Sequence, residues 1–98
     1  MARFKTHILE PISSTEKAAE LLGQMFPEDN STWLLLSSDG EPIGCFNIEA
    51  GIDHDYGPGV WADQIGQHDG VDEQLLDVLR RLQTQLGGEI GWETFRDS

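Results

Sequence analysis

The hydrophobic and polar positions of the N-terminal third predict a strand followed by a helix. Alternation over residues 3–9 predicts the strand, and Pro11 ends it. Ser13 and Glu16 then have the spacing of a capping box, which predicts the start of a helix. The apolar residues that follow recur at helical spacing and form one stripe, which stops before Pro27: Ala18, Leu21, Leu22, Met25 and Phe26.

The middle of the chain has the clearest hairpin signal. Two apolar runs, residues 33–36 and 43–48, flank a loop that contains Asp39-Gly40. Asp-Gly accepts the positive φ of a tight turn, and Pro42 is tolerated because it starts the second strand. A further strand is predicted over residues 60–65.

The last third predicts a second amphipathic helix and a final strand. Acidic residues near 69–72 and the basic pair Arg80-Arg81 suit the two ends of a helix dipole, and Gly87-Gly88 stops the helix. Residues 89–95 predict the strand. The apolar face of the helix is made of leucines: Leu75, Leu76, Leu79, Leu82 and Leu86.

These elements predict one α+β domain over residues 1–98. The order is β-α-β-β-β-α-β, and the two helices must pack on a sheet, which we expect to be mixed. A ferredoxin-like βαββαβ fold, with one strand fewer, is the alternative, and the status of residues 60–65 decides between them. The sheet is expected to expose an edge near residues 89–95, which favours a homodimer.

Net charge narrows the classes of partner. The 98 residues include 18 Asp and Glu but only 6 Lys and Arg, so the formal charge is −12. No Lys or Arg occurs between Lys17 and Arg80. This balance argues against binding to nucleic acid or to an anionic membrane surface, because both need cationic side chains. It favours a basic protein as the partner.

Other features exclude a membrane span and an internal disulfide. The longest apolar run, residues 33–36, is far too short to cross a bilayer, and residues 1–10 lack the apolar block of a secretory signal. Cys45 is the single cysteine, and we expect a buried, inert thiol rather than a nucleophile. The expected location is cytoplasmic.

Three local motifs, in this order of elements, resemble the GNAT acetyltransferase superfamily. Residues 8–29 resemble its opening strand and helix, and residues 33–48, with Asp-Gly-Glu-Pro-Ile-Gly at 39–44, resemble its central hairpin. Gln67-His68-Asp69-Gly70-Val71-Asp72 is similar to its cofactor loop, Gln/Arg-x-x-Gly-x-Gly/Ala. The resemblance implies acetyl-coenzyme A as cofactor and assigns four residues to its pyrophosphate: Gln67, Gly70, Val71 and Asp72.

The chain departs from that family at position 72. Asp72 stands where the family has Gly or Ala, and its carboxylate would repel the pyrophosphate by roughly 1–4 kcal/mol at about 4 Å. We therefore expect Asp69 or Asp72 to cap the helix with no cofactor bound. A gap between the strands at 60–65 and 89–95 would leave room for a pantetheine arm, whereas closed pairing would leave none.

Acetyl transfer also needs an acid and a base. The family continues beyond the strand that matches residues 89–95 and carries there a tyrosine that protonates the leaving thiolate. This sequence ends at Ser98, and its single tyrosine is Tyr56. Glu49, Asp63 and His68 are candidates for the base by position.

Two further groups of residues carry weaker signals. Asp53-His54-Asp55 and His68 are competent metal ligands, but their spacing matches no recognised motif, so we expect no metal. Trp33, Trp61 and Trp92 each fall in a predicted strand, which indicates core packing. A tryptophan left exposed would instead be an interface anchor.

Three functions follow from these patterns. The first is a small acidic GNAT-like domain that lacks acetyltransferase activity and acts by binding a protein. The second is a minimal coenzyme A-dependent N-acyltransferase. The third is an acidic inhibitor or immunity-type protein that covers a basic site on its partner.

Overall fold

The computed structural model describes residues 3–50, 58–66 and 70–96, with residues 3–5 and 92–96 described by their backbone alone. All seven predicted elements are present, and one very short strand is added. In chain order the elements are β1 (Arg3–Glu10), α1 (Thr15–Met25), β2 (Glu28–Asp29), β3 (Thr32–Leu36), β4 (Pro42–Glu49), β5 (Gly59–Gln64), α2 (Val71–Leu86) and β6 (Glu89–Arg96).

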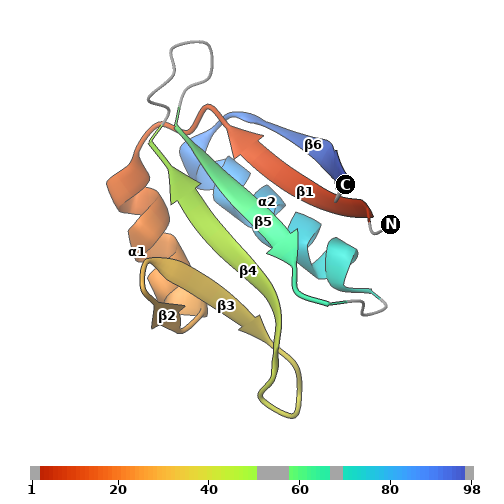
Figure 1. Cartoon of the computed structure of the whole chain (residues 1–98). Helices are drawn as coiled ribbons and strands as arrows, with labels where there is room; N and C mark the ends of the chain where they lie inside the picture. Colours follow the sequence, from red (N-terminus) through yellow and green to blue (C-terminus); the bar gives the residue numbers. More distant parts are fainter. Residues whose placement is uncertain (1–2, 51–57, 67–69, 97–98) are drawn as a thin grey trace.

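The strands form one open six-stranded sheet in the order β2-β3-β4-β5-β1-β6 (Figure 1). Every neighbouring pair is antiparallel. The α+β class and the two helices are therefore confirmed, but the expectation of a mixed sheet is wrong. The reason is that β1 lies between β5 and β6 and runs antiparallel to both.

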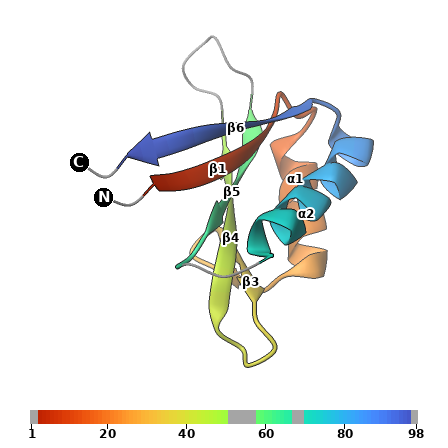
Figure 2. The same ribbon diagram turned by 90° about the vertical axis from the view of Figure 1, so that its right-hand side faces the viewer.

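The first strand of the chain, β1, lies between β5 and β6, two strands that follow each other in the sequence. Because β5 and β6 both run antiparallel to β1, they point the same way, and α2 joins them across one face of the sheet. The predicted strand at 60–65 is confirmed as β5, which pairs with β4 on one side and with β1 on the other. Both helices lie on the same face, so the molecule has two layers and one sheet face without helices (Figure 2).

The core lies between the helices and the covered face of the sheet. Alternate positions of the strands point into it, such as Leu9, Phe46, Val60 and Ala62, each of which is fully buried. The Phe46 ring stacks on Phe26 with centroids 5.0 Å apart. The apolar stripe of α2 covers these residues and is buried along its whole length: Val71, Leu75, Val78, Leu79, Leu82 and Leu86.

The helix ends follow local chemistry. The Ser14 side chain accepts a hydrogen bond from the Lys17 backbone N–H, so the N-cap of α1 lies one residue beyond the predicted Ser13. Gly87 ends α2 with φ 74°, as its glycine pair predicts. In the described part of the chain, neither helix is long and apolar enough to span a membrane.

Candidate functional site

The start of α2, where the sequence suggests a phosphate-binding loop, carries a histidine–carboxylate pair. Asp72 Oδ1 lies 3.3 Å from Nε2 of His7, a residue of β1 that is close in space but distant in sequence. The His7 side chain is 5% exposed and that of Asp72 is 48% exposed. The Asp72 carboxylate thus faces both the solvent and a buried imidazole, and it adds negative charge to the first turn of the helix.

The helix cap differs from the one expected. Gly70, with φ 81°, is the N-cap of α2, and no side chain makes a capping hydrogen bond there. Capping by Asp72 is therefore wrong, because this residue lies inside the first turn and its carboxylate reaches His7. Val71 is buried in the core. Gln67, His68 and Asp69 lie outside the described residues.

No gap separates the strands that would have to hold a pantetheine arm. β1 occupies the space between β5 and β6: Leu9 pairs with Val60 on one side and with Ile90 on the other. The pairing of β1 with β6 continues without a break from Glu10 to Arg3. The closed pairing leaves no opening between these strands for an extended ligand.

Two of the predicted acid–base candidates lie on the helix-free face of the sheet. Glu49 is exposed at the end of β4, and Asp63 is half-buried on the neighbouring strand β5. The Thr6 hydroxyl donates a hydrogen bond to Asp63 Oδ1, so this carboxylate is engaged within the sheet. The other two candidates, Tyr56 and His68, lie outside the described residues. The described candidates therefore form no acid–base pair.

Cys45 lies on the same face, directly opposite Asp63 in the pairing of β4 with β5. The thiol is half-buried rather than buried. Burial raises its pKa above the ordinary value, and the negative charge of Asp63 raises it further. The thiolate is therefore disfavoured, which supports an inert thiol.

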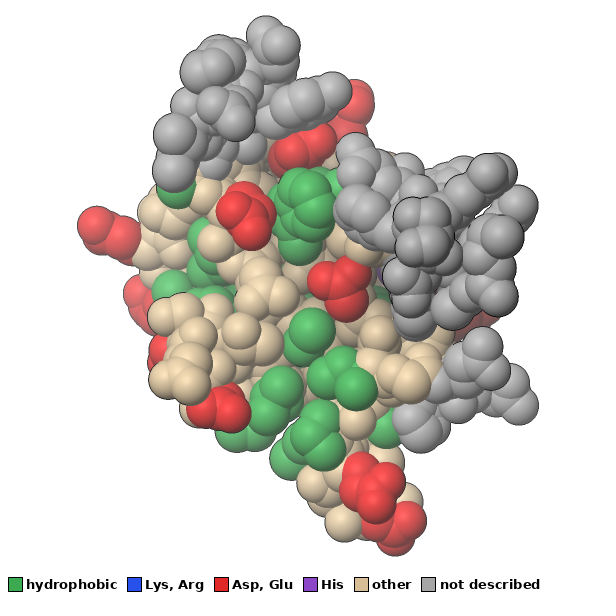
Figure 3. Space-filling view, in the orientation of Figure 1, with side chains coloured by type: hydrophobic (Ala, Val, Ile, Leu, Met, Phe, Trp, Pro, Cys, Tyr) green, Lys and Arg blue, Asp and Glu red, His purple; other side chains and the backbone are tan. Residues whose placement is uncertain are grey.

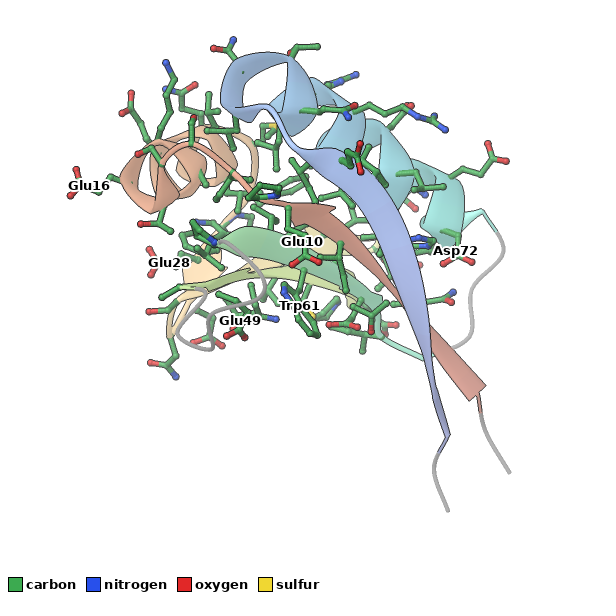
Figure 4. The ribbon with its side chains drawn as sticks, turned by 90° about the horizontal axis from the view of Figure 1, so that it is seen from above. Glu10, Glu16, Glu28, Glu49, Trp61 and Asp72 are labelled. Carbon is green, nitrogen blue, oxygen red and sulfur yellow. The ribbon has the colours of Figure 1, made fainter. Side chains whose placement is uncertain are left out.

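The helix-free face has a tryptophan at its centre. Trp61 is half-buried and lies between Asn47 of β4 and Ile8 of β1, its direct partners in the sheet. The expectation of core packing is confirmed for Trp33, which is buried, but Trp61 points away from the helices (Figure 4). The side chain of Trp92 lies outside the described residues.

Two carboxylates flank a glycine beside Trp61. In the sheet Gly59 lies opposite Glu49, and on its other side it touches Glu10. A Cβ atom at position 59 would lie 3.0 Å from Glu10 Cβ and 2.9 Å from the Leu9 carbonyl oxygen. Because glycine has no side chain, Glu10 can lie against the backbone here, with Glu49 on the far side of β5. Figure 4 shows Glu49 and Trp61 on the helix-free side.

Charged side chains are distributed unequally over the molecule. Among the described side chains, every Lys and Arg belongs to a helix: Lys17 to α1, and Arg80 and Arg81 to α2. The helix-free face combines an apolar patch with acidic residues and shows no cationic side chain among those described (Figure 3). The alternation of Trp61 and Asp63 with buried Val60 and Ala62 is the sequence signal that could have identified this face.

A hollow between the helices is lined mainly by side chains that carry no charge. It has a volume of about 150 Å³ and is lined by Leu21, Gln24, Met25, Arg81, Leu82 and Gln85. Arg81 is its one ionisable group. In the described part of the chain, no three side chains of His, Cys, Asp or Glu converge as metal ligands would. The weak candidate ligands Asp53, His54, Asp55 and His68, for which the sequence predicts no metal, lie outside the described residues.

The helix-free face, with Trp61 between acidic residues, is thus the surface with the most distinctive chemistry. Comparison with known proteins finds no relative of this chain: no protein-family model, no curated protein and no solved structure matches it.

Proposed function

We propose that this chain is a non-catalytic binding domain whose helix-free sheet face binds a basic surface of a partner protein. One observation carries the proposal: Trp61 lies among the carboxylates of Glu10, Glu49 and Asp63, on a face with no described cationic side chain. The net charge of −12 also attracts a basic partner, and it acts over a longer distance than the contacts around Trp61.

The chemistry of this face suits arginine and lysine side chains. The face of an indole ring attracts a cation, and the interaction contributes about 0.5–2 kcal/mol according to how far the site is desolvated. Carboxylates beside the ring supply hydrogen-bond acceptors for a guanidinium group. A surface of one charge sign also accelerates the encounter with an oppositely charged partner. An acidic inhibitor or immunity-type protein that covers a basic site is one form of this function.

We also propose that this chain does not catalyse acetyl transfer. What supports it is that the Asp72 carboxylate remains at the start of α2, and that β1 fills the space between β5 and β6. A minimal acyltransferase that uses acetyl-coenzyme A is the competing function. Titration calorimetry with acetyl-coenzyme A distinguishes them: we expect no heat of binding, and micromolar affinity would refute this part of the proposal.

For the fold, we favour the ferredoxin-like alternative over the GNAT-like order. What supports it is that β1, β4, β5 and β6, with the two helices, follow the βαββαβ succession with interleaved connections. β2 and β3 are then additional strands inserted after α1 at the edge of the sheet, so the strand at 60–65 belongs to the ferredoxin-like succession and does not count against it.

The binding function is tested by capture on matched charge variants. Immobilised wild-type protein is exposed to a lysate of the source cells, and the retained proteins are identified and purified for direct titration. We expect basic proteins that elute with salt, whose binding is lost in Glu49→Lys and Trp61→Ala. Glu28→Lys, which makes the same charge change at an exposed site on β2, should bind like the wild type. Equal binding by all variants, or capture of acidic proteins alone, would refute the proposal.

A further inference from the structure

The helix-free face has an apolar end beside its carboxylates. On β3, Leu34 lies opposite Cys45 and so points to this face, and Leu36 lies on the same side because side chains of a strand alternate. Beyond β4, Ile65 follows Asp63 at the same spacing, and its backbone N–H donates to β4 just after the end of β5. The apolar end consists of these aliphatic residues and the direct partner of Leu36 in the sheet: Leu34, Leu36, Pro42 and Ile65.

The apolar end is exposed and lies between acidic residues. Leu36 is 40% exposed and Ile65 is 38% exposed, the two highest values among the described large apolar side chains. Asp39 and Glu41 are exposed in the turn beyond this end, and Asp63 lies on its inner side. Figure 3 shows the apolar surface between acidic side chains. An apolar centre with a polar rim is the usual composition of a protein interface.

The backbone of the sheet has no free hydrogen-bonding groups in the middle of this face. β4, β5 and β1 are each paired on both sides, so a single extended segment laid on them would leave its own N–H and C=O groups unpaired. A helix satisfies its own backbone and needs only side-chain contacts, which is how α1 and α2 pack on the opposite face (Figure 2). Ile65 lies six positions after Gly59. That length of about 20 Å matches a helix of about 13 residues.

The polar groups on either side of Trp61 are already fixed by hydrogen bonds. The Thr6 hydroxyl donates to Asp63 Oδ1, and the Thr32 hydroxyl donates to Asn47 Oδ1 at 2.8 Å. Groups that are fixed before binding lose less side-chain entropy when a partner arrives. A carboxylate oxygen has more than one lone pair, so Asp63 can still accept hydrogen bonds from a ligand.

We propose that the partner presents a basic amphipathic helix, which lies along β4 and β5 on the helix-free face. Its apolar residues cover Leu36 and Ile65, and an arginine about two turns away stacks on Trp61 and pairs with Asp63. Trp61 and Ile65 are separated by about 13 Å along the strand, and residues two turns apart on a helix by about 11 Å. This inference rests on the binding function proposed above and names the structural class of the partner.

The same chemistry selects arginine and a different protein. A planar guanidinium stacks on an indole while it donates two parallel hydrogen bonds to a carboxylate, which a lysine ammonium cannot do. A second copy of this chain does not match the face, because its own helix-free face carries the same carboxylates and like charges across an interface oppose binding. Its two helices carry five Asp and Glu against three Lys and Arg, so they are not basic either.

Two synthetic peptides of identical composition test the inference. Both contain about 14 residues of leucine, arginine and alanine; one places the leucines in a helical stripe with arginine at its end, and the other scrambles the order. The scrambled peptide carries the same charge, so it measures the ionic contribution alone. Titration calorimetry should show that the amphipathic peptide binds at least about tenfold more tightly, and circular dichroism should show that it gains helix on binding.

Variants of the apolar end separate this inference from the effect of charge. The double variant Leu36→Ser, Ile65→Ser should weaken binding of the amphipathic peptide by about tenfold and leave binding of the scrambled peptide unchanged. Met25→Ser is the matched control, because Met25 is 37% exposed but belongs to α1 and lines the hollow between the helices. It should bind both peptides like the wild type. Urea denaturation confirms that each variant is folded.

The possible failures are distinguishable. Equal affinity of the wild type for the two peptides would overturn the helix, and so would an amphipathic peptide that binds the double variant as tightly as the wild type. Either result leaves a basic partner of this face in place. If Glu49→Lys and Trp61→Ala bind both peptides like the wild type, the binding function proposed for the face fails as well. Binding of neither peptide would also overturn the inference.

Discussion

The two faces of the sheet are built from alternate residues of the same strands, yet they carry different chemistry. The covered face contributes Phe46, Val60 and Ala62, which are fully buried beneath the helices. The helix-free face contributes Cys45, Trp61 and Asp63, which are only half-buried. Thr32 and Asn47 are joined there by a hydrogen bond of 2.8 Å between their side chains. The covered face thus forms the core, while the helix-free face retains polar and aromatic groups that stay partly in contact with solvent.

The largest effect that separates the faces should come from removing an aromatic ring from each. Phe46→Ala is expected to lower the free energy of unfolding by about 3–5 kcal/mol, because it leaves a cavity and removes the stack with Phe26. Trp61→Ala should cost about 1–2 kcal/mol, since part of the ring is already in water. Urea denaturation measures both, and equal losses would contradict the division between the faces.

A smaller effect is expected from the glycine between Glu10 and Glu49. Gly59→Ala places a methyl group 2.9 Å from the Leu9 carbonyl oxygen, so the strands must shift, at a cost of about 1–3 kcal/mol. Gly91→Ala in β6 is the matched control, because a Cβ atom there has nothing within 4 Å. Its change should remain within about 0.5 kcal/mol. Similar unfolding midpoints for the two variants would refute the close approach at Gly59.

The thiol on the helix-free face gives a pH-dependent effect. Burial, and then the charge of Asp63, hold the pKa of Cys45 above its ordinary value of 9.0. A group with a raised pKa in the folded state adds stability below its unfolded pKa and loses it as the pH rises towards the folded value. The free energy of unfolding of the wild type, relative to that of Cys45→Ser, should therefore fall as the pH rises above about 9. A difference that is flat with pH would contradict it.

The same thiol can be probed chemically. We expect Cys45 to react with iodoacetamide at pH 8 more slowly than free cysteine, and Asp63→Asn to accelerate the reaction because one of the two causes of the raised pKa is removed. A rate equal to that of free cysteine would show that the thiolate is not disfavoured.

The smallest effect concerns the carboxylates that make the face acidic. Glu49 and Glu10 belong to strands two places apart in the sheet, about 10 Å at the usual strand spacing. Glu49→Lys should therefore raise the free energy of unfolding at low salt by about a few tenths of a kcal/mol, seen as a slightly higher thermal midpoint, and the gain should disappear in 1 M salt. Glu28→Lys, on the distant edge strand, controls for the change in net charge. A gain in Glu28→Lys as large as that in Glu49→Lys would refute a local origin.

Local patterns predicted the elements because they depend on neighbouring residues. Each of these signals involves residues that are close in the sequence: the leucine stripe of α2, the Asp-Gly turn and the glycine pair after Leu86. The cap of α1 was misplaced by one residue because Ser13 and Ser14 are both competent caps. Sequence could not distinguish them, since the choice depends on how the chain leaves β1.

The candidate site could be predicted only in part. The acidic charge was recognised from the sequence, but Glu49 and Asp63 were singled out only as candidate bases for acetyl transfer, and Glu10, Gly59 and His7 were not singled out. The sequence by itself determined the succession of strands and helices, the amphipathic faces and the net charge, since these follow from local periodicity and composition. Only the tertiary structure placed β1 between β5 and β6, joined His7 to Asp72 and grouped the carboxylates around Trp61. The physical reason is that strand order and register depend on long-range pairing, and backbone hydrogen bonds between strands carry no signature in any short stretch of sequence.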